Sequence, residues 1–183
     1  MSRTFVFGGA RSGKSAYAER LAAQADKEVV YIATGAAGDT EMAVRIAHHR
    51  AQRPAHWSTV EEPLALGAAI HAWRAPHRVL LVDCLTLWLS NLMFADGAQY
   101  PDVGAVELPA RFHTERAALL AALSIDSGDI VLVSNEVGMG IVPWGAVSRS
   151  YVDEAGRLNQ SVAAVCDNVA WVAAGLPLML KGA

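Results

Sequence analysis

Short apolar runs alternate with alanine-rich stretches of helical spacing along the chain. The apolar runs predict six β-strands, at residues 4–7, 29–33, 57–60, 79–83, 130–134 and 169–172. The runs at 79–83 and 130–134 are apolar at every position before their last residue. Such continuous runs are typical of parallel strands that are covered on both faces.

The helical spacing predicts six helices, at residues 16–25, 41–53, 64–73, 85–94, 106–123 and 146–167. Pro54 ends the second helix, because the residue before a proline avoids the helical region, and Pro63 opens the third. Strands that alternate with helices predict a mostly parallel sheet flanked by helices. The whole chain, residues 1–183, is therefore expected to form a single doubly wound α/β domain.

A glycine-rich loop lies between the first predicted strand and the first predicted helix. Its sequence, Gly8-Gly9-Ala10-Arg11-Ser12-Gly13-Lys14-Ser15, is a full match to the phosphate-binding loop pattern. Glycines allow backbone N–H groups to surround phosphates, and the helix N-terminus adds positive potential. We expect this loop to bind nucleotide, Lys14 to reach the β- and γ-phosphates, and the Ser15 hydroxyl to hold Mg²⁺. The predicted fold is thus of the P-loop NTPase, RecA-like type; the alternative is a glycine-rich turn with an incidental lysine.

Asp83 ends one of the two continuously apolar strands. Ligands of open α/β sheets bind where the carboxyl ends of the strands meet. Asp83 is therefore expected beside Lys14, as a carboxylate that holds Mg²⁺ directly or through water. The alternative is a capping role, because aspartate is also favoured just before a helix.

Composition narrows the class of protein. The chain is 53% hydrophobic and 18% charged, which excludes intrinsic disorder, and its net charge of −3 offers no general attraction for nucleic acid. Residues 79–95 are the strongest candidate for a membrane span, but Asp83 lies inside them and the length is at the lower limit. We therefore expect no stable membrane insertion.

The first residues lead into a strand without a signal-peptide pattern, and Cys84 and Cys166 lie far apart in apolar runs. This pattern predicts a cytoplasmic protein with two buried thiols, rather than a disulfide or a metal site.

The predicted helix 41–53 concentrates two histidines and three arginines. Arg45 lies three residues before His48 and four before His49, so either imidazole can share a helix face with its guanidinium. A cation there would favour a neutral imidazole and could grip a phosphate. The alternative, from these residues alone, is a solvated basic helix end.

Four separated motifs resemble those of one enzyme family. They are the phosphate-binding loop, Arg45-Ile46-x-x-His49-Arg50 leading to Arg53-Pro54-x-x-Trp57-x-Thr59-x-Glu61, the run Ser134 to Pro143, and Gly156-Arg157-Leu158-Asn159-Gln160. In this order they are similar to the bifunctional adenosylcobinamide kinase / adenosylcobinamide-phosphate guanylyltransferase family of cobalamin biosynthesis. The resemblance runs from about residue 4 to the last predicted strand.

The resemblance implies two reactions, both with Mg²⁺. In the first, the γ-phosphoryl group of ATP or GTP passes to the hydroxyl of the aminopropanol arm of adenosylcobinamide. In the second, a histidine attacks the α-phosphorus of GTP, releases pyrophosphate and becomes a GMP–histidine phosphoramidate. Adenosylcobinamide phosphate then takes the GMP, giving adenosyl-GDP-cobinamide. The nucleophile must be a neutral imidazole, which histidine supplies near pH 7.

The family pattern falls on His49 as the catalytic nucleophile, with His48 as the alternative or as an assisting group. By the same resemblance, further residues are expected to contact the guanine nucleotide or its metal: Ala33, Thr34, Gly35, Arg50, Ala51, Gln52, Arg53, Glu61 and Asp83.

Two other functions share parts of these motifs. A simple P-loop small-molecule kinase would use everything through Asp83 but would leave the His49 segment unexplained. A nucleotide-switched GTPase would need an Asn-Lys-x-Asp run that reads guanine, which the sequence lacks.

Residues 135–143 follow directly after a buried strand, which favours a binding loop, with a structural connection as the alternative. Trp144, beside this segment, is the one of the five tryptophans to test against the corrinoid; most of the others are expected in the core or at an interface. Arg149, Arg157 and Asn159 are expected to touch phosphate or a neighbouring subunit, or to be ordinary surface residues. A corrinoid is large for a 183-residue nucleotide-binding domain. We therefore expect it to bind between the subunits of a homo-oligomer, with a trimer favoured.

Overall fold

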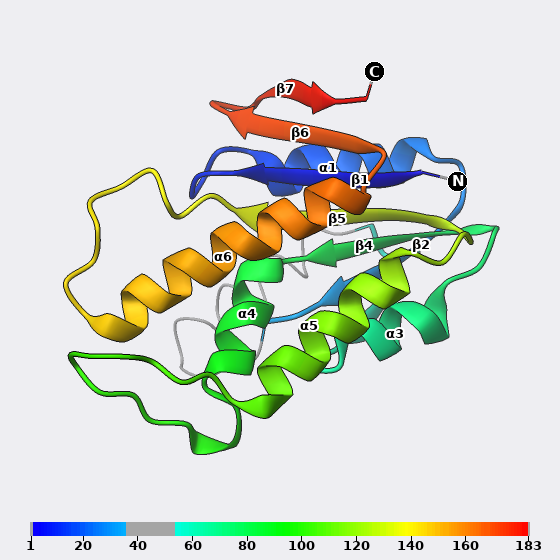
Figure 1. Ribbon diagram of the computed structural model, residues 1–183. Coiled ribbons are helices and arrows are strands. Elements are labelled where there is room, and N and C mark those ends of the chain that lie inside the picture. Colours follow the sequence, from blue (N-terminus) through cyan, green and yellow to red (C-terminus); the bar gives the residue numbers. More distant parts are fainter. Residues whose placement is uncertain (1, 36–53, 183) are drawn as a thin grey trace.

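The computed structural model describes residues 2–35 and 54–182. Within them, the strands form one sheet in the order β3-β2-β4-β5-β1-β6-β7 (Figure 1). β7 runs antiparallel to β6, and the other neighbouring pairs are parallel. The strands are β1 (Arg3–Gly8), β2 (Glu28–Ala33), β3 (Ser58–Glu61), β4 (Arg78–Asp83), β5 (Asp129–Asn135), β6 (Asn168–Ala173) and β7 (Leu176–Lys181). The predicted mostly parallel sheet is confirmed.

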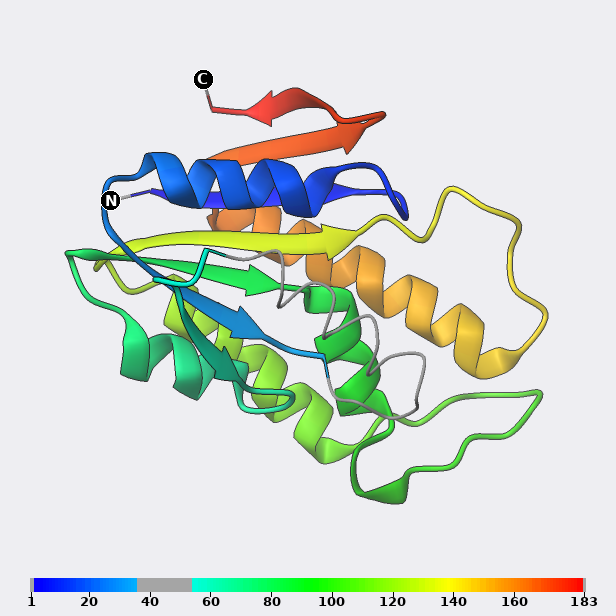
Figure 2. The same ribbon diagram turned by 180° about the vertical axis from the view of Figure 1, so that it is seen from behind.

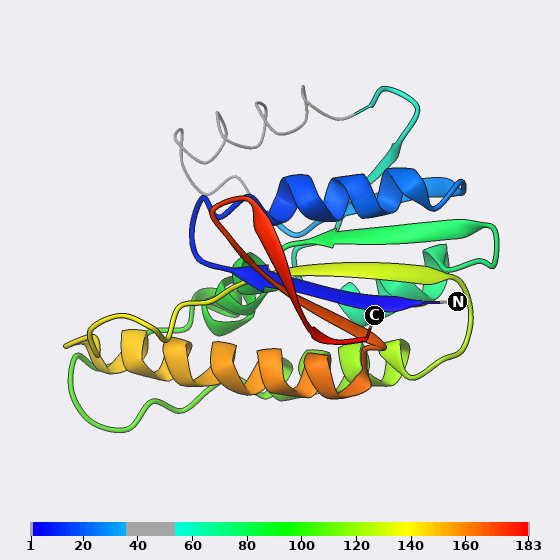
Figure 3. The ribbon, with the colours of Figure 1, turned by 90° about the horizontal axis from the view of Figure 1, so that it is seen from above.

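Helices cover both faces of this sheet, as the view from above shows (Figure 3). The described helices are α1 (Lys14–Gln24), α3 (Leu66–Trp73), α4 (Leu85–Met93), α5 (Ala110–Leu123) and α6 (Ala146–Val165), with a 3₁₀ turn η1 (Ala95–Gly97) after α4. α1 lies on one face, and α3 to α6 lie on the other. The predicted helix 41–53 lies outside the described residues.

Alternate strand residues fill two hydrophobic cores, one on each face of the sheet. Phe5 packs in the larger core, with the helices α3 to α6, whereas Val6 packs in the smaller core, with α1. Trp88 of α4 is fully buried in the larger core, and its indole N–H donates to the carbonyl oxygen of Leu64 at 2.7 Å. Cys84 and Cys166 are buried free thiols, as predicted.

The apolar stretch 79–95 folds as most of β4 followed by α4, and ends where η1 begins. Among the described residues, none of the helices has both the length and the apolar character that a bilayer span requires.

The predicted helices are confirmed within residues 54–182 and at α1, but several of their boundaries were wrong by one to four residues, and local hydrogen bonds explain two of the differences. α3 begins at Leu66 rather than at residue 64, because the Glu62 carboxylate accepts the N–H groups of Leu64 and Ala65 at 2.9 and 2.7 Å. α6 ends at Val165 rather than at residue 167, because the N–H of Asp167 already donates to Arg3 of β1.

α5 begins at Ala110 rather than at residue 106. Pro109 immediately precedes it, and its ψ of 148° is extended rather than helical. A proline also restricts the residue before it to extended conformations, so residues 106–108 do not join the helix.

β7 was missed by the sequence prediction, which ended the sheet with the strand at 169–172. Its six positions are all exposed, so it shows neither an alternating pattern nor a buried run, and it contains Pro177. Pairing with β6 makes it an edge strand, the position in a sheet where proline is tolerated.

Candidate functional site

The phosphate-binding loop connects β1 to α1, and two of its glycines are required by the backbone. A Cβ on Gly8 would lie 2.2 Å from the carbonyl oxygen of Val172 in β6. Gly13, which precedes the first turn of α1, has a φ of +91° that L side chains rarely adopt. The loop is thus enclosed by backbone from β6 and from the turn between β6 and β7.

Lys14 is the buried cation of this loop. Its side chain is 8% exposed, and its ammonium donates to the carbonyl oxygen of Gly9 at 3.2 Å. Burial lowers the pKa of Lys14, and the nearby Asp83 carboxylate opposes that shift. A charged ammonium held inside the loop is suited to neutralise the oxygens of a polyphosphate.

Asp83 and the phosphate-binding loop lie at the same edge of the sheet. β5 separates β4 from β1, so that Asp83 at the end of β4 and Gly8 at the end of β1 flank the end of β5. The Asp83 carboxylate is close enough to act on the pKa of Lys14. The structure therefore brings together the cation and the carboxylate that the sequence singled out.

The predicted segment Ala33 to Gly35 begins at the last residue of β2, at the same end of the sheet, and its threonine hydroxyl has partners within the chain. The Thr34 hydroxyl donates to the carbonyl oxygen of Cys84 at 2.7 Å and accepts the N–H of Cys84 at 2.9 Å. The carbonyl oxygen of Thr34 accepts the Asn91 amide at 2.7 Å. Thr34 therefore ties β2 to the start of α4. Glu61 ends β3 in register with Ala33 and is exposed.

Asn135 is a polar residue at the carboxyl end of the central strand of this site, and no individual role was predicted for it from the sequence. It ends β5, in register with Gly8. Its amide nitrogen donates to the Thr86 hydroxyl at 2.8 Å, and its carbonyl oxygen accepts the Asn159 amide at 3.2 Å. The signal that could have found it is the one that marked Asp83, a polar residue at the end of a buried apolar run.

The residues on α6 that were expected at phosphate or at a subunit contact have partners within the chain. Asn159 is 8% exposed and accepts the hydroxyl of Ser134 at 2.8 Å, in addition to its bond to Asn135. Arg157 pairs with Glu154, and Arg149 donates to the carbonyl oxygens of Pro143 and Trp144. Asn159 is thus not an ordinary surface residue, and its hydrogen bonds tie α6 to the end of β5.

The turn between β6 and β7 contacts the phosphate-binding loop, which the sequence did not indicate. The N–H of Gly175 donates to the carbonyl oxygen of Ser12 at 2.8 Å. The two turns lie at the same side of the sheet in the view from behind (Figure 2). In the described part of the chain, the buried Ser12 hydroxyl has no hydrogen-bond partner.

The remaining predicted residues lie outside the described part of the chain. These are His48, His49, Arg50, Ala51, Gln52 and Arg53. Their roles stay predictions from the sequence.

Comparison with known proteins gives relatives along the whole chain. Residues 4–180 match the family model described as cobinamide kinase / cobinamide phosphate guanyltransferase. The bifunctional adenosylcobalamin biosynthesis protein CobP of Pseudomonas aeruginosa is 54% identical over 180 residues, with 98% of each chain covered. The protein CobU of Escherichia coli, which carries the same bifunctional description, is 43% identical over 96% of this chain and 98% of its own.

Two solved structures are similar in fold. A prototypical ATPase of the type III secretion system of pathogenic bacteria superposes with a TM-score of 0.57 at 16% identity, covering 97% of this chain and 56% of its own. The ATPase EscN from the type III secretion system of enteropathogenic E. coli gives a TM-score of 0.55 at 15% identity, with 94% and 43% covered. At these identities the likeness concerns the fold, which agrees with the predicted P-loop NTPase type.

Proposed function

Because the chain belongs to the cobinamide kinase / cobinamide phosphate guanyltransferase family, we propose that it catalyses both reactions with one phosphate-binding loop. It phosphorylates adenosylcobinamide with ATP or GTP, and it then transfers GMP from GTP to adenosylcobinamide phosphate. The observation that carries this proposal is the family match over residues 4–180, together with the buried Lys14 beside Asp83.

In the kinase reaction, the hydroxyl oxygen of the aminopropanol arm attacks the γ-phosphorus. The bond between that phosphorus and the β,γ-bridging oxygen breaks, the nucleoside diphosphate leaves, and the hydroxyl proton passes to a base or to water. Lys14 and the backbone N–H groups of residues 8–15 hold the β- and γ-phosphates. Their charge stabilises the negative charge that develops on the phosphoryl oxygens.

Mg²⁺ is the metal that this site fits. The Ser15 hydroxyl and the Asp83 carboxylate are hard oxygen donors. Within residues 2–35 and 54–182, no cluster of three or more histidine, cysteine or acidic side chains could hold a metal by itself. Mg²⁺ characteristically takes one or two protein oxygens and completes its shell with phosphate and water. When bound, it neutralises charge on the transferred phosphate.

In the second reaction, an imidazole nitrogen of His49 forms a bond to the α-phosphorus of GTP while pyrophosphate leaves with the electrons of the α–β bridge. A phosphate oxygen of adenosylcobinamide phosphate then displaces the imidazole. Support for His49 comes from the sequence pattern Arg45-Ile46-x-x-His49-Arg50. Arg50 to Arg53, with Ala33 to Gly35 and Glu61, are proposed to hold the nucleotide during this step.

The test is transfer of label from GTP to the protein. We expect GTP labelled at the α-phosphate to give an acid-labile, base-stable protein label, which is the stability of a phosphoramidate. His49→Ala should abolish the label and leave the kinase reaction active, and His48→Ala is the matched control that should keep both. If the wild-type protein phosphorylates adenosylcobinamide but takes up no label from GTP, the proposed GMP transfer is wrong and the chain acts as a simple kinase. Label that survives in His49→Ala but not in His48→Ala would move the nucleophile to His48.

We also propose a homo-oligomer, with a trimer favoured. Leu176, Leu178 and Leu180 of the edge strand β7 are 72%, 55% and 57% exposed, which is unusual for a chain that stays alone. Light scattering coupled to size exclusion measures the mass directly, and a mass near that of one chain at micromolar concentration would refute the proposal.

The proposed location is the cytoplasm, where ATP and GTP are available and where buried free thiols such as Cys84 and Cys166 persist. No binding to nucleic acid is expected, because the net charge is −3. Fractionation of cells and a mobility-shift assay test these two statements.

A further inference from the structure

The loop between β5 and α6, residues 136–145, exposes apolar side chains to an unusual degree. Met139 and Val142 are each 76% exposed, Trp144 is 92% exposed and Ile141 is 98% exposed. Scattered apolar residues are normal on a surface, whereas a contiguous apolar group marks a contact site for a ligand or a partner.

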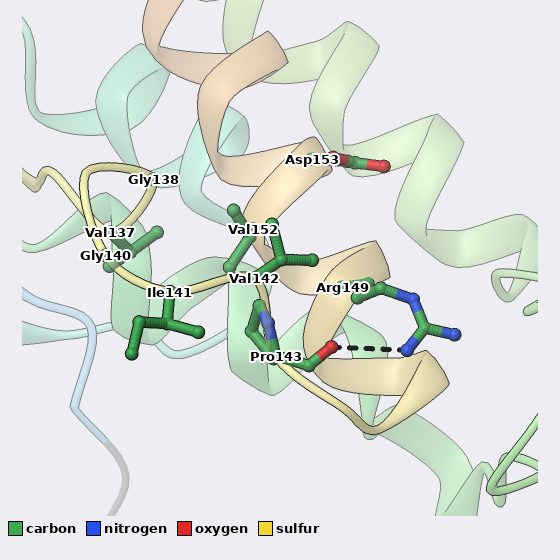
Figure 4. Close-up of a pocket in the computed structure, with 9 residues that line it drawn as sticks. All are labelled: Val137, Gly138, Gly140, Ile141, Val142, Pro143, Arg149, Val152 and Asp153. Carbon is green, nitrogen blue, oxygen red and sulfur yellow. Dashed lines mark hydrogen bonds between the residues drawn. The ribbon is translucent and has the colours of Figure 1, made fainter.

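The loop is fixed at both ends by hydrogen bonds, so its exposed side chains are presented from a defined backbone. At its start, the N–H of Glu136 donates to the carbonyl oxygen of Gly8 at 3.0 Å. At its end, the Arg149 guanidinium donates to the carbonyl oxygens of Pro143 and Trp144, the first at 3.2 Å (Figure 4). A fixed backbone lowers the entropy that a binding partner must overcome.

A small cavity opens between this loop and the first turns of α6. Its volume is about 190 Å³, and Figure 4 shows its lining residues. Most of the lining is apolar, including Val137, Ile141 and Val152, but Arg149 and Asp153 also border it. The Asp153 carboxylate points away from the loop in Figure 4, so the Arg149 guanidinium at the rim is the polar group that a carboxamide oxygen in this cavity would meet, beside apolar walls.

The loop also lies next to the site of phosphoryl transfer. It leaves β5 directly after Asn135, which is in register with Gly8 at the start of the phosphate-binding loop. Figures 1 and 2 both show the loop projecting beyond the edge of the sheet at which the phosphate-binding loop lies. A large acceptor resting on residues 136–145 can therefore extend a hydroxyl arm towards the γ-phosphate.

We propose that residues 136–145 form the corrinoid-binding surface, with Trp144, Ile141 and Met139 against the macrocycle and the cavity beside Arg149 holding one carboxamide arm. The proposal rests on the kinase function proposed above. A corrin ring offers a broad apolar face with methyl groups and carboxamide arms at its rim, and the loop and cavity complement both. The cavity is too small for the ring itself, which therefore lies on the loop.

The first experiment compares Trp144→Ala with Ile125→Ser. Ile125 is also an apolar residue on the surface and is 41% exposed. It lies just before β5, at the end of that strand away from the phosphate-binding loop. Binding of cobinamide is measured by calorimetry, and the kinase KM is measured for adenosylcobinamide and for ATP. Trp144→Ala should raise the corrinoid Kd and KM about ten-fold, as expected for loss of a large aromatic contact, and should leave the KM for ATP within two-fold. Ile125→Ser should change neither.

Three results would overturn the proposal. The first is a Trp144→Ala variant whose corrinoid Kd and KM equal those of an active wild type. That result would refute this binding surface but not the proposed kinase function. Another is an equal rise in both Michaelis constants. The third is a change in molecular mass by light scattering that accounts for the loss, which would make the loop an interface between copies of the chain. A wild type that binds no cobinamide and phosphorylates none would instead overturn the underlying function.

Discussion

Replacing Asn159 by alanine should destabilise the fold through two groups that lose their partners, the buried Ser134 hydroxyl and the half-buried Asn135 carbonyl. Asn159 is 8% exposed on α6, where its Oδ1 accepts the Ser134 hydroxyl at 2.8 Å and its amide donates to the Asn135 carbonyl oxygen at 3.2 Å. Ser134 itself is 1% exposed. The substitution removes the acceptor of the buried Ser134 hydroxyl and the donor to the half-buried Asn135 carbonyl.

The expected cost follows from these two unsatisfied groups. A buried polar group that loses its hydrogen bond costs about 1–3 kcal/mol. Alanine recovers less than about 0.7 kcal/mol through its higher helix propensity. We therefore expect Asn159→Ala to lower the free energy of unfolding by about 1–4 kcal/mol, because the buried Ser134 hydroxyl bears the full cost and the half-buried Asn135 carbonyl bears part of it. This is a large part of the roughly 5–15 kcal/mol that is typical of a domain.

Urea unfolding, followed by circular dichroism, measures this loss as a shift of the midpoint at constant m-value. Ser134→Ala and the double variant complete a cycle, in which the coupling between the two side chains should be about 1 kcal/mol. Gln160→Ala, at the exposed neighbouring position on α6, is the control and should stay within about 0.5 kcal/mol of the wild type. If Asn159→Ala matches Gln160→Ala, or if the cycle shows no coupling, the network does not hold the end of β5.

Three further outcomes are expected. Lys14→Ala should lower both the kcat/KM of the kinase reaction and the yield of GMP label at least about 100-fold, because both reactions need the triphosphate to be held by the same loop. Steady-state kinetics measures the first effect and labelling measures the second. Loss of one activity alone would contradict a shared loop. The hydrogen bond from Arg3 holds the pKa of Asp167 below its ordinary value of 3.8, so its stabilising effect is present above that pH and is lost as the pH falls through the lower, folded-state pKa. Asp167→Asn should therefore flatten the acid decline of Tm below about pH 4 and cost less than about 1 kcal/mol at neutral pH, because the pair is partly exposed; an unaltered acid decline would count against the pairing. Burial raises the pKa of Cys166 to about 12 and also raises that of Cys84, so neither thiol should react with Ellman's reagent near pH 8 until urea unfolds the chain, and stoichiometric labelling of the folded protein would disagree with the described burial.

The parts of the site that the sequence predicted depend on local chemistry. The glycines of residues 8–15 must lie between a strand and a helix, and the run Val79 to Val82 is apolar because both faces of β4 are covered. Asp83 then falls at the carboxyl end of a strand, where ligands of such sheets bind. Each of these inferences needs only a short stretch of sequence.

The parts that the sequence missed depend on which strands become neighbours. Asn135 lies at the centre of the site only because β5 pairs with both β1 and β4. β7 is a strand only because β6 offers it an edge, since its own residues carry no pattern of burial. Nothing in the sequence indicated that the Thr34 hydroxyl bonds to Cys84, about fifty residues along the chain; the contact of Thr34 with nucleotide stays a prediction. Such pairings are made in tertiary structure and leave no periodic signal.

The position of β1 within the sheet has a consequence for synthesis of the chain. Its two neighbours are β5 and β6, and Gly175 of the following turn bonds to Ser12. The phosphate-binding loop therefore leaves the ribosome early, but the strands that flank it are made more than a hundred residues later. A nascent chain arrested at Gly128, before β5 is made, should not retain a GTP analogue, whereas the released chain should. Nucleotide binding would thus distinguish a finished polypeptide from an unfinished one, and GTP in the cell would stabilise only chains that have been completed.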